Sequence, residues 1–203
     1  MLPPILILAP YSSGSTAVTG YLARAGAYAC PPFQMTNDPR TKNSHEPKAL
    51  RDAICGIVQE TTLQYTRSPE NFAMFFRSWL PLEEEKAKAL GHTCLVMKHP
   101  LSCFVLNQII DVCQPRIVIV GRPLDEIEKT RERRGWHPVY GRAGAVKIYD
   151  KIFTHVLSQN LSSYLVGYRD FQNRAEIRQD LLKFCNLAPS TTELKQAEGW
   201  LRK

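Results

Sequence analysis

The chain has 203 residues, of which 44% are hydrophobic and 22% charged, and its formal net charge is +7 at pH 7. This length and composition favour a single globular domain over residues 1–203 and exclude a disordered or low-complexity chain. The positive charge favours a polyanionic partner such as a nucleotide, a nucleic acid, an anionic membrane or a sulfated sugar, but a basic solvated surface without a role explains it equally well.

The N-terminal third begins with a short apolar run at residues 4–10, which predicts a central strand covered on both faces. The run is too short to cross a bilayer, so no membrane span is expected. Apolar residues at helical spacing then predict a helix from Ser15 to Ala25, capped by Gly26. Residues 30–47 contain four prolines and predict an irregular surface excursion. The next helix is expected over Leu50–Val58.

The middle of the chain contains an aromatic segment, residues 72–79, which we expect in the core or in a pocket wall. A strand over Thr93–Met97 ends in Lys-His-Pro, and a helix is predicted over Leu101–Val112. A further strand at Arg116–Gly121 precedes Pro123, which is expected at the first position of a charged helix.

The last part of the chain repeats this alternation, with a helix over Val146–Leu157, a strand over Ser163–Gly167 and a helix over Ile177–Cys185. Alternating strands and helices predict an α/β three-layer sandwich with a mostly parallel central sheet. Ligands of such sheets bind beyond the carboxyl ends of the strands. We therefore expect the loops after the first three strands to form one site.

The cysteines are scattered, with no Cys-x-x-Cys pair and no grouping with histidine at zinc-ligand spacing: Cys30, Cys55, Cys94, Cys103, Cys113 and Cys185. Several lie in apolar stretches, where buried thiols act as small hydrophobic groups. This pattern predicts reduced thiols, a cytoplasmic location and no structural metal.

The segment at residues 9–16 joins the first strand to the first helix through small residues. Backbone N–H groups and the positive end of the helix dipole would converge there on an anion, and Gly14 would allow a phosphate to approach closely. An unliganded helix cap is the alternative interpretation. An ATP or GTP P-loop would need glycine at position 9 and lysine at position 15, but Ala9 and Ser15 occupy them, which weakens a kinase interpretation.

Four segments together resemble the sulfotransferases that use 3′-phosphoadenosine 5′-phosphosulfate (PAPS). Residues 10–16 are similar to the family's 5′-phosphosulfate loop. Arg122, with Thr130 eight residues later, is similar to its 3′-phosphate pair. Residues 98–100 resemble its lysine-containing turn, and residues 168–187 resemble its late Y-E-D-L and L-x-x-F-L-G-L segments.

The resemblance implies a P-loop-like fold and in-line transfer of a sulfuryl group from PAPS to a hydroxyl or amine, with no metal required. It implies donor binding by Ser12, Ser13, Gly14, Ser15, Thr16, Arg122 and Thr130. The family usually has a basic residue where this chain has Ser12, so the charge at the leaving oxygen would have to come from Lys98 or from the basic region at 122–134.

The resemblance also implies a general base, for which Glu46, His45 and His99 are the candidates and Glu46 is preferred. A glutamate that complements the dipole of the following helix is the alternative for Glu46. The basic cluster Lys129, Arg131, Arg133 and Arg134 alternates with glutamates and is interpreted as a solvated helix face, with contact to an anion as the alternative.

Other functions stay open at this point. A degenerate protein that binds PAPS or its desulfated product without turnover fits Ser12, and a nucleotide kinase fits less well. A nucleic-acid partner is not expected, because no aromatic-basic or helix-turn-helix motif is present. The acceptor, a small molecule, carbohydrate or lipid, would contact the loops at 30–47, 65–82 and 135–145. The sequence does not specify it or the oligomeric state.

Overall fold

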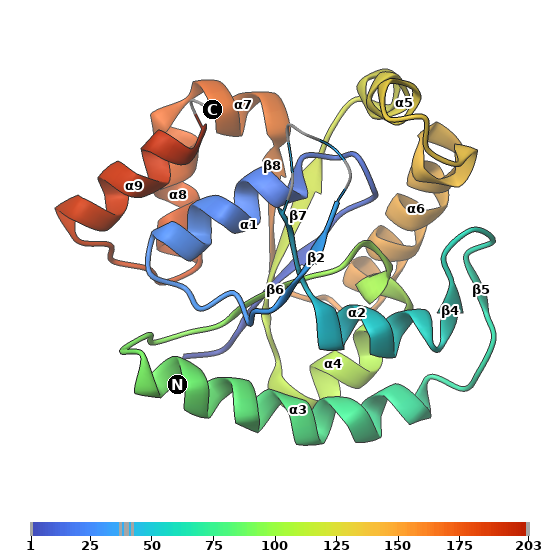
Figure 1. Cartoon of the computed structure of the whole chain (residues 1–203), viewed down its shortest axis with the longest axis horizontal. Coiled ribbons are helices and arrows are strands. Elements are labelled where there is room, and N and C mark those ends of the chain that lie inside the picture. The colour runs from blue at the N-terminus through green and yellow to red at the C-terminus, as the bar shows by residue number, and fades with distance from the viewer. Residues whose placement is uncertain (1, 37, 39–40, 42, 202–203) are drawn as a thin grey trace.

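The centre of the fold is a four-stranded parallel sheet (Figure 1). The computed structural model describes residues 2–36, 38, 41 and 43–201. The strands are in the order β6-β1-β7-β8, and their bounds are β1 Ile5–Leu8, β6 Val96–Lys98, β7 Arg116–Gly121 and β8 Ser163–Gly167. Each pairing is parallel, with Ile5 opposite Val96 on one side and Arg116 on the other. The prediction of a mostly parallel sheet is confirmed.

Helices cover both faces of this sheet, so the predicted three-layer α/β architecture is also confirmed (Figure 1). One face carries α1 (Ser15–Arg24), α7 (Tyr168–Asn173), α8 (Ala175–Phe184) and α9 (Thr191–Leu201). The other carries α2 (Lys48–Cys55), α3 (Glu70–Ala89), α4 (Leu106–Cys113) and α6 (Arg142–Ser158). Helix α5 (Leu124–Arg133) follows β7 and packs beside α6. Within the described residues, none of the helices has the length and apolarity needed to cross a membrane.

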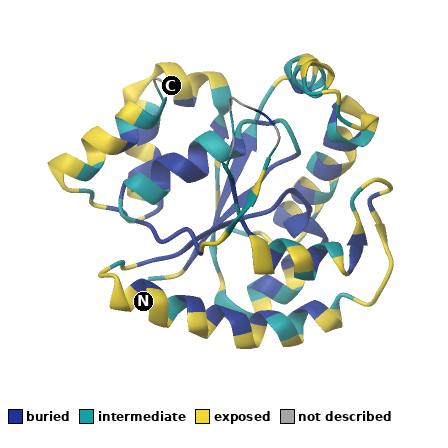
Figure 2. Ribbon diagram, viewed as in Figure 1, coloured by how far each residue is buried: buried dark blue, intermediate teal, exposed yellow. Residues whose placement is uncertain are grey.

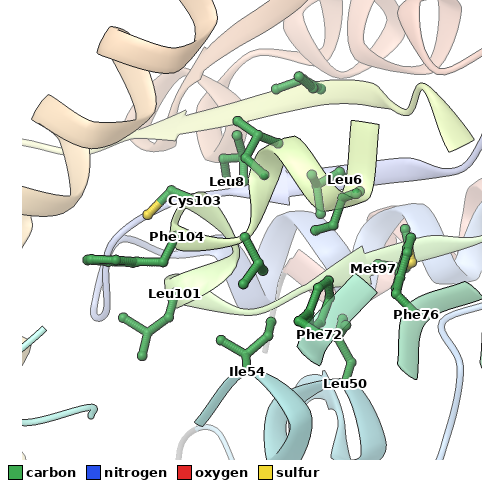
Figure 3. Packing of buried hydrophobic residues seen from close by; sticks show 14 of the residues in the cluster. Leu6, Leu8, Leu50, Ile54, Phe72, Phe76, Met97, Leu101, Cys103 and Phe104 are labelled. Carbon is green, nitrogen blue, oxygen red and sulfur yellow. The ribbon is translucent and has the colours of Figure 1, made fainter. Parts of the chain in front are cut away.

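The strands feed two separate cores, because successive side chains of a strand point to opposite faces. Leu6 and Leu8 of β1 pack toward α2 and α3, whereas Ile5 and Ile7 pack toward α1 and α8. Figure 3 shows the first core, where Phe72 of α3 lies among aliphatic side chains from α2 and the sheet. Burying one such side chain contributes about 1.5–3 kcal/mol. The buried strands and the exposed outer helix faces are visible in Figure 2.

The segment at 30–47 is more regular than the sequence predicts. Strands β2 (Phe33–Met35) and β3 (Asn43–Pro47) pair antiparallel, and the Ser44 hydroxyl donates to the Gln34 carbonyl oxygen at 2.7 Å. Of the described prolines, Pro31 and Pro32 precede this pairing and Pro47 lies at its end, where a missing N–H group is tolerated, and Pro39 lies outside the described residues. The segment therefore holds Glu46 in a defined position beside the main sheet.

Several element boundaries differ from prediction. Helix α2 ends at Cys55, and Val58 belongs instead to β4 (Val58–Gln59), which pairs antiparallel with β5 (Gln64–Tyr65). The helix expected from Leu101 begins as a 3₁₀ turn at Pro100–Phe104 before α4, and a second 3₁₀ turn spans Pro138–Tyr140. Pro123 is the N-cap of α5 and not its first residue, since its extended ψ of 135° precedes the helical turn.

Helix α9 was not predicted, although it packs along α1. The Trp200 indole Nε1 donates to the Ala17 carbonyl oxygen at 3.1 Å, and the Arg24 guanidinium lies 4.0 Å from the ring centroid. A Cβ on Gly20 would lie 2.6 Å from the same indole, so glycine is what allows the two helices to approach. Arg178 of α8 also binds Glu198 through two hydrogen bonds of 2.8 Å. These contacts hold α9 and α8 together and fix α1, whose N-terminus forms part of the candidate site.

Candidate functional site

The loop between β1 and α1 forms a cradle of backbone and hydroxyl groups. Ser12 and Gly14 both have positive φ, 60° and 91°, and α1 begins directly afterwards at Ser15. The first-turn N–H groups of a helix have no intrahelical acceptor. Among the described residues, the hydroxyls of Ser12 and Ser13 are buried without a hydrogen-bond partner. Unsatisfied buried hydroxyls cost about 1–3 kcal/mol each, so an anionic ligand in this cradle would relieve a real cost.

Gly14 is required by packing as well as by its backbone angle. A Cβ at this position would lie 2.3 Å from the Tyr168 ring, which lies against the loop from the start of α7. The same ring is 4.9 Å from the Arg122 guanidinium, within the range of a cation–π contact. Tyr168, interpreted from sequence only as part of a late motif, therefore helps to shape the cradle.

Arg122 and Thr130 meet beside this loop. The Arg122 Nη1 donates to the Thr130 hydroxyl at 3.1 Å and to the Ser12 carbonyl oxygen at 2.9 Å. Its Nε donates to Glu126 at 3.1 Å. Arg122 follows the end of β7 and Thr130 lies about two turns into α5, so the spacing of eight brings both to one side. These three hydrogen bonds hold the guanidinium in one orientation.

Lys98 lies at the end of β6 and joins three parts of the site. Its Nζ donates to the Thr16 hydroxyl at 3.0 Å and to the Ser44 carbonyl oxygen at 2.8 Å, and it is 2.9 Å from Glu46 Oε1. The side chain is only 3% exposed. The chain therefore has a buried cation directly beside the first turn of α1, although Ser12 carries no charge.

Glu46 comes to the same point from β3. Burial, the largest single effect, raises the pKa of its carboxyl group, but the charge and hydrogen bond of Lys98, together with His99 and Arg51, outweigh it, and the net shift is downward. The carboxylate is ionised at neutral pH and lines the cavity. Of the candidate bases, Glu46 is the one that the fold brings to the cavity surface.

The two histidines lie outside the cavity lining. His99 is fully buried, its Nδ1 accepts from the Leu101 N–H group at 3.3 Å, and its Nε2 is 4.0 Å from Glu46. The His45 ring packs between Phe33 and Trp200, with centroids 5.1 and 5.5 Å away. Burial lowers the pKa of both imidazoles to about 4, so both are neutral at pH 7.

A cavity of about 680 Å³ connects these groups, within the size range of small-molecule sites. Two members of the basic cluster, Arg133 and Arg134, line it and pair with the buried carboxylate of Asp38 at 2.9 and 2.6 Å. Lys129 is exposed, and Arg131 pairs with Glu128. The solvated-face interpretation thus describes half of the cluster, and the other half faces the cavity.

Arg51 and Glu60 also line the cavity and were not predicted from the sequence, whereas Tyr11 and Tyr140 lie in loops that were expected to contact ligands. The Tyr11 hydroxyl donates to Glu60 Oε1 at 3.1 Å, and Arg51 donates to Glu60 Oε2 at 3.0 Å. The Tyr140 ring lies 4.5 Å from the Tyr11 ring. Glu60 lies in the tight β4–β5 connection, where an isolated polar residue carries no motif. In the sequence, this part of the cavity was indicated only by the position of Tyr11 in the segment at 9–16 and by the loop at 135–145, which contains Tyr140.

Cys55, Glu60 and His99 form a group whose ligand atoms lie within 4.8 Å of one another. Its chemistry fits a metal poorly. The His99 Nδ1 accepts a backbone N–H, so the nitrogen facing the group carries the proton. Burial also raises the pKa of the Cys55 thiol to about 12, and Glu60 is already bound by Arg51 and Tyr11.

Comparison with known proteins gives solved structures but no sequence relative. No protein-family model matches the chain, and no curated protein does. The sulfotransferase domain of the Synechococcus PCC 7002 olefin synthase superposes with a TM-score of 0.61 over 95% of this chain and 76% of that one, at 17% identity. Sulfotransferase STF9 from Mycobacterium avium gives 0.57 over 98% and 68%, at 11% identity.

A sugar kinase from Janibacter sp. is also similar, with a TM-score of 0.51 over 92% of this chain and 96% of the kinase, at 13% identity. Identities this low show a shared fold and not a shared activity. The predicted resemblance to sulfotransferases is confirmed at the level of the fold.

Proposed function

We propose that the chain is a sulfotransferase that moves a sulfuryl group from PAPS to a hydroxyl or amine of a small acceptor. The observation that carries the proposal is the convergence of three distant elements, the loop at 12–16, the Arg122–Thr130 pair and Lys98, on one cavity. The fold in which they converge is that of sulfotransferases. The six free cysteines further support a cytoplasmic location.

In this proposal the donor's 5′-phosphosulfate lies on the N–H groups and hydroxyls of residues 12–16. The 3′-phosphate binds Arg122 and Thr130. Three of the five Arg122 N–H groups bind protein atoms, and within the described residues those of Nη2 do not, so this nitrogen suits a phosphate oxygen. The two phosphate sites share the Ser12 carbonyl contact and are thereby fixed relative to each other.

The transfer step breaks the bond between sulfur and the bridging oxygen of the donor and forms one to the acceptor oxygen or nitrogen in line. Lys98 would stabilise the charge that develops on the leaving oxygen, in place of the basic residue that the sulfotransferase family usually has at the position of Ser12. As Lys98 turns toward that oxygen its hold on Glu46 weakens, which raises the pKa of Glu46. Glu46 would then take the proton that the acceptor loses. His45 and His99 would support this arrangement without touching the substrate.

Two alternatives have specific support. Ser12 favours a protein that binds PAPS or 3′-phosphoadenosine 5′-phosphate (PAP) without efficient turnover. The sugar-kinase likeness favours phosphoryl transfer, but Ala9 and Ser15 stand where a nucleotide-triphosphate loop needs glycine and lysine.

Calorimetry with PAP, ATP and a DNA oligomer tests the proposal. Binding of PAP alone, followed by transfer of radioactive sulfate from PAPS to an acceptor panel, is the expected result. PAP binding without transfer would favour the binding protein. Preference for ATP or DNA over PAP would overturn the proposal.

A further inference from the structure

We infer that the acceptor is a neutral, polyhydroxylated ring, a sugar, that lies on the Tyr140 ring and binds Glu60 and Arg51 through neighbouring hydroxyls. This inference rests on the proposed sulfotransfer and names its acceptor class. It follows from the part of the cavity that the proposed donor-binding groups do not occupy. This part is lined by Tyr11, Arg51, Glu60, Trp136 and Tyr140 and is called the acceptor wall.

The acceptor wall directly adjoins the reacting groups. Tyr11 belongs to the anion loop, and its hydroxyl binds Glu60 at 3.1 Å. Burial and the Glu60 and Glu46 charges hold the pKa of Tyr11 well above its usual range, so this hydroxyl stays a donor. The Arg51 charge also acts on Glu46. The Tyr11 ring also lies 6.4 Å from the ring of His99, whose Nε2 is 4.0 Å from Glu46, and Glu46 and Lys98 line the same cavity as the wall. A molecule on the wall would therefore lie in the cavity that Glu46 and Lys98 line.

Charges along this end of the cavity alternate in sign. Lys98 pairs with Glu46 at 2.9 Å, and Arg51 pairs with Glu60 at 3.0 Å. An amine acceptor would meet a cation beside each carboxylate, and an anionic acceptor would meet a carboxylate beside each cation. The balance favours a neutral acceptor that both donates and accepts hydrogen bonds, which is the property of a hydroxyl group.

The polar edge of the wall also disfavours an apolar acceptor. The side chains of Arg51 and Glu60 are 28% and 26% exposed, so water still reaches them in the free protein. A phenol or lipid would displace that water without replacing its hydrogen bonds, and this desolvation weakens binding. Glu60 accepts hydrogen bonds from Tyr11 on Oε1 and from Arg51 on Oε2, and since each carboxylate oxygen has two lone pairs, the group can also accept from a ligand hydroxyl.

Aromatic rings supply the other half of the recognition. Tyr11, Trp136 and Tyr140 all line the cavity, and the centroid of the Tyr140 ring lies 4.5 Å from that of Tyr11 and 5.9 Å from that of Trp136, in tilted and edge-on arrangements. Such rings give apolar contact area with a polar tip. A ring with C–H groups on its face and hydroxyls on its rim matches both features of the wall.

The test uses the full chain loaded with PAP, and the probes are the methyl glycosides of glucose, galactose, mannose and N-acetylglucosamine, with 4-nitrophenol and hexylamine for comparison. Calorimetry measures binding, and transfer from radioactive PAPS measures turnover. Saturable binding of at least one glycoside and transfer to it, above that to 4-nitrophenol and hexylamine, is expected. Failure of every glycoside to bind overturns the inference. PAP binding, measured first, reports separately on the proposed function.

Three variants at two positions then test the wall itself. Glu60→Gln removes a charged acceptor and should raise the KM for the glycoside about tenfold with little change in kcat or in PAP affinity. Tyr140→Phe should keep most of the binding, whereas Tyr140→Ala should lose it. The matched control Glu85→Gln, on the exposed face of α3, should change nothing. Unchanged KM in both Glu60→Gln and Tyr140→Ala would overturn the inference.

Discussion

Replacing Lys98 with methionine separates the structural role of this residue from its proposed catalytic role. The change keeps the length of the side chain but removes contacts with Thr16, Ser44 and Glu46, all within 3.0 Å. Glu46 would be left as a nearly buried, unpaired carboxylate, which costs about 3–5 kcal/mol. For a chain of this size each kcal/mol lowers Tm by about 2–4 °C, so calorimetry should show a loss of about 6–20 °C.

Turnover should fall further than stability explains. Loss of one preorganised donor to a developing negative charge costs about 10²–10³ in kcat. Steady-state transfer from radioactive PAPS, at a temperature where the variant is folded, measures this loss. The pKa of Glu46 should also rise once Lys98 no longer lowers it, since burial, which raises the pKa, is then opposed by His99 and Arg51 without Lys98.

The double variant Lys98→Met/Glu46→Gln is the control for misfolding. Removing both charges removes the unpaired carboxylate, so most of the lost stability should return, while kcat stays low. If the kcat of Lys98→Met is within about threefold of that of the parent protein, Lys98 does not have the proposed catalytic role, because no cation would then be needed beside the loop.

Three further outcomes are expected. Arg122→Lys keeps the charge but loses the planar fork, so calorimetry should show PAP binding weakened about tenfold or more and AMP binding unchanged; equal losses for both nucleotides would contradict a 3′-phosphate contact. Gly14→Ala puts a Cβ 2.3 Å from the Tyr168 ring at φ 91° and should abolish PAP binding and lower Tm, and adding Tyr168→Ala should restore only part because the backbone strain persists. Burial lowers the pKa of His45 and His99 from 6.5 to about 4, so the unfolded chain binds more protons between these values. The free energy of unfolding, measured in urea, should reach its full value above about pH 6.5 and decrease by about 3 kcal/mol per histidine as the pH falls toward 4. The variant His99→Gln should show a weaker dependence of this free energy on pH.

Much of the proposed donor side of the candidate site could be located from the sequence, because its signals are local. The anion loop needs only a buried strand, small residues and a helix start, all within the first 16 residues. Arg122 lies just before α5 and Thr130 lies about two turns into it, which brings the two side chains together. Lys98 was identified by its place at the end of a strand, and parallel strands bring such ends together.

The contacts within the proposed acceptor wall were not predictable, because they join segments that are far apart in the sequence and share no sequence motif. Tyr11 and Tyr140 are 129 positions apart, and Glu60 is a single glutamate in a hairpin that the sequence did not indicate. Asp38 binds Arg133 and Arg134 across 95 and 96 positions. His99 was a candidate base in the sequence analysis because the residues around it in the sequence do not indicate that the fold buries its side chain completely.

The packing of α9 on α1 has a consequence for the order in which the protein acquires its site. Trp200 contacts Ala17 across 183 positions, and Glu198 contacts Tyr21 across 177. During synthesis α1 leaves the ribosome long before α9, and domains complete their folding only when the required segments have emerged. A nascent chain that still lacks α9 therefore carries the anion loop on a helix with one uncovered side. We therefore expect the candidate site to be complete only once α9 has packed on α1.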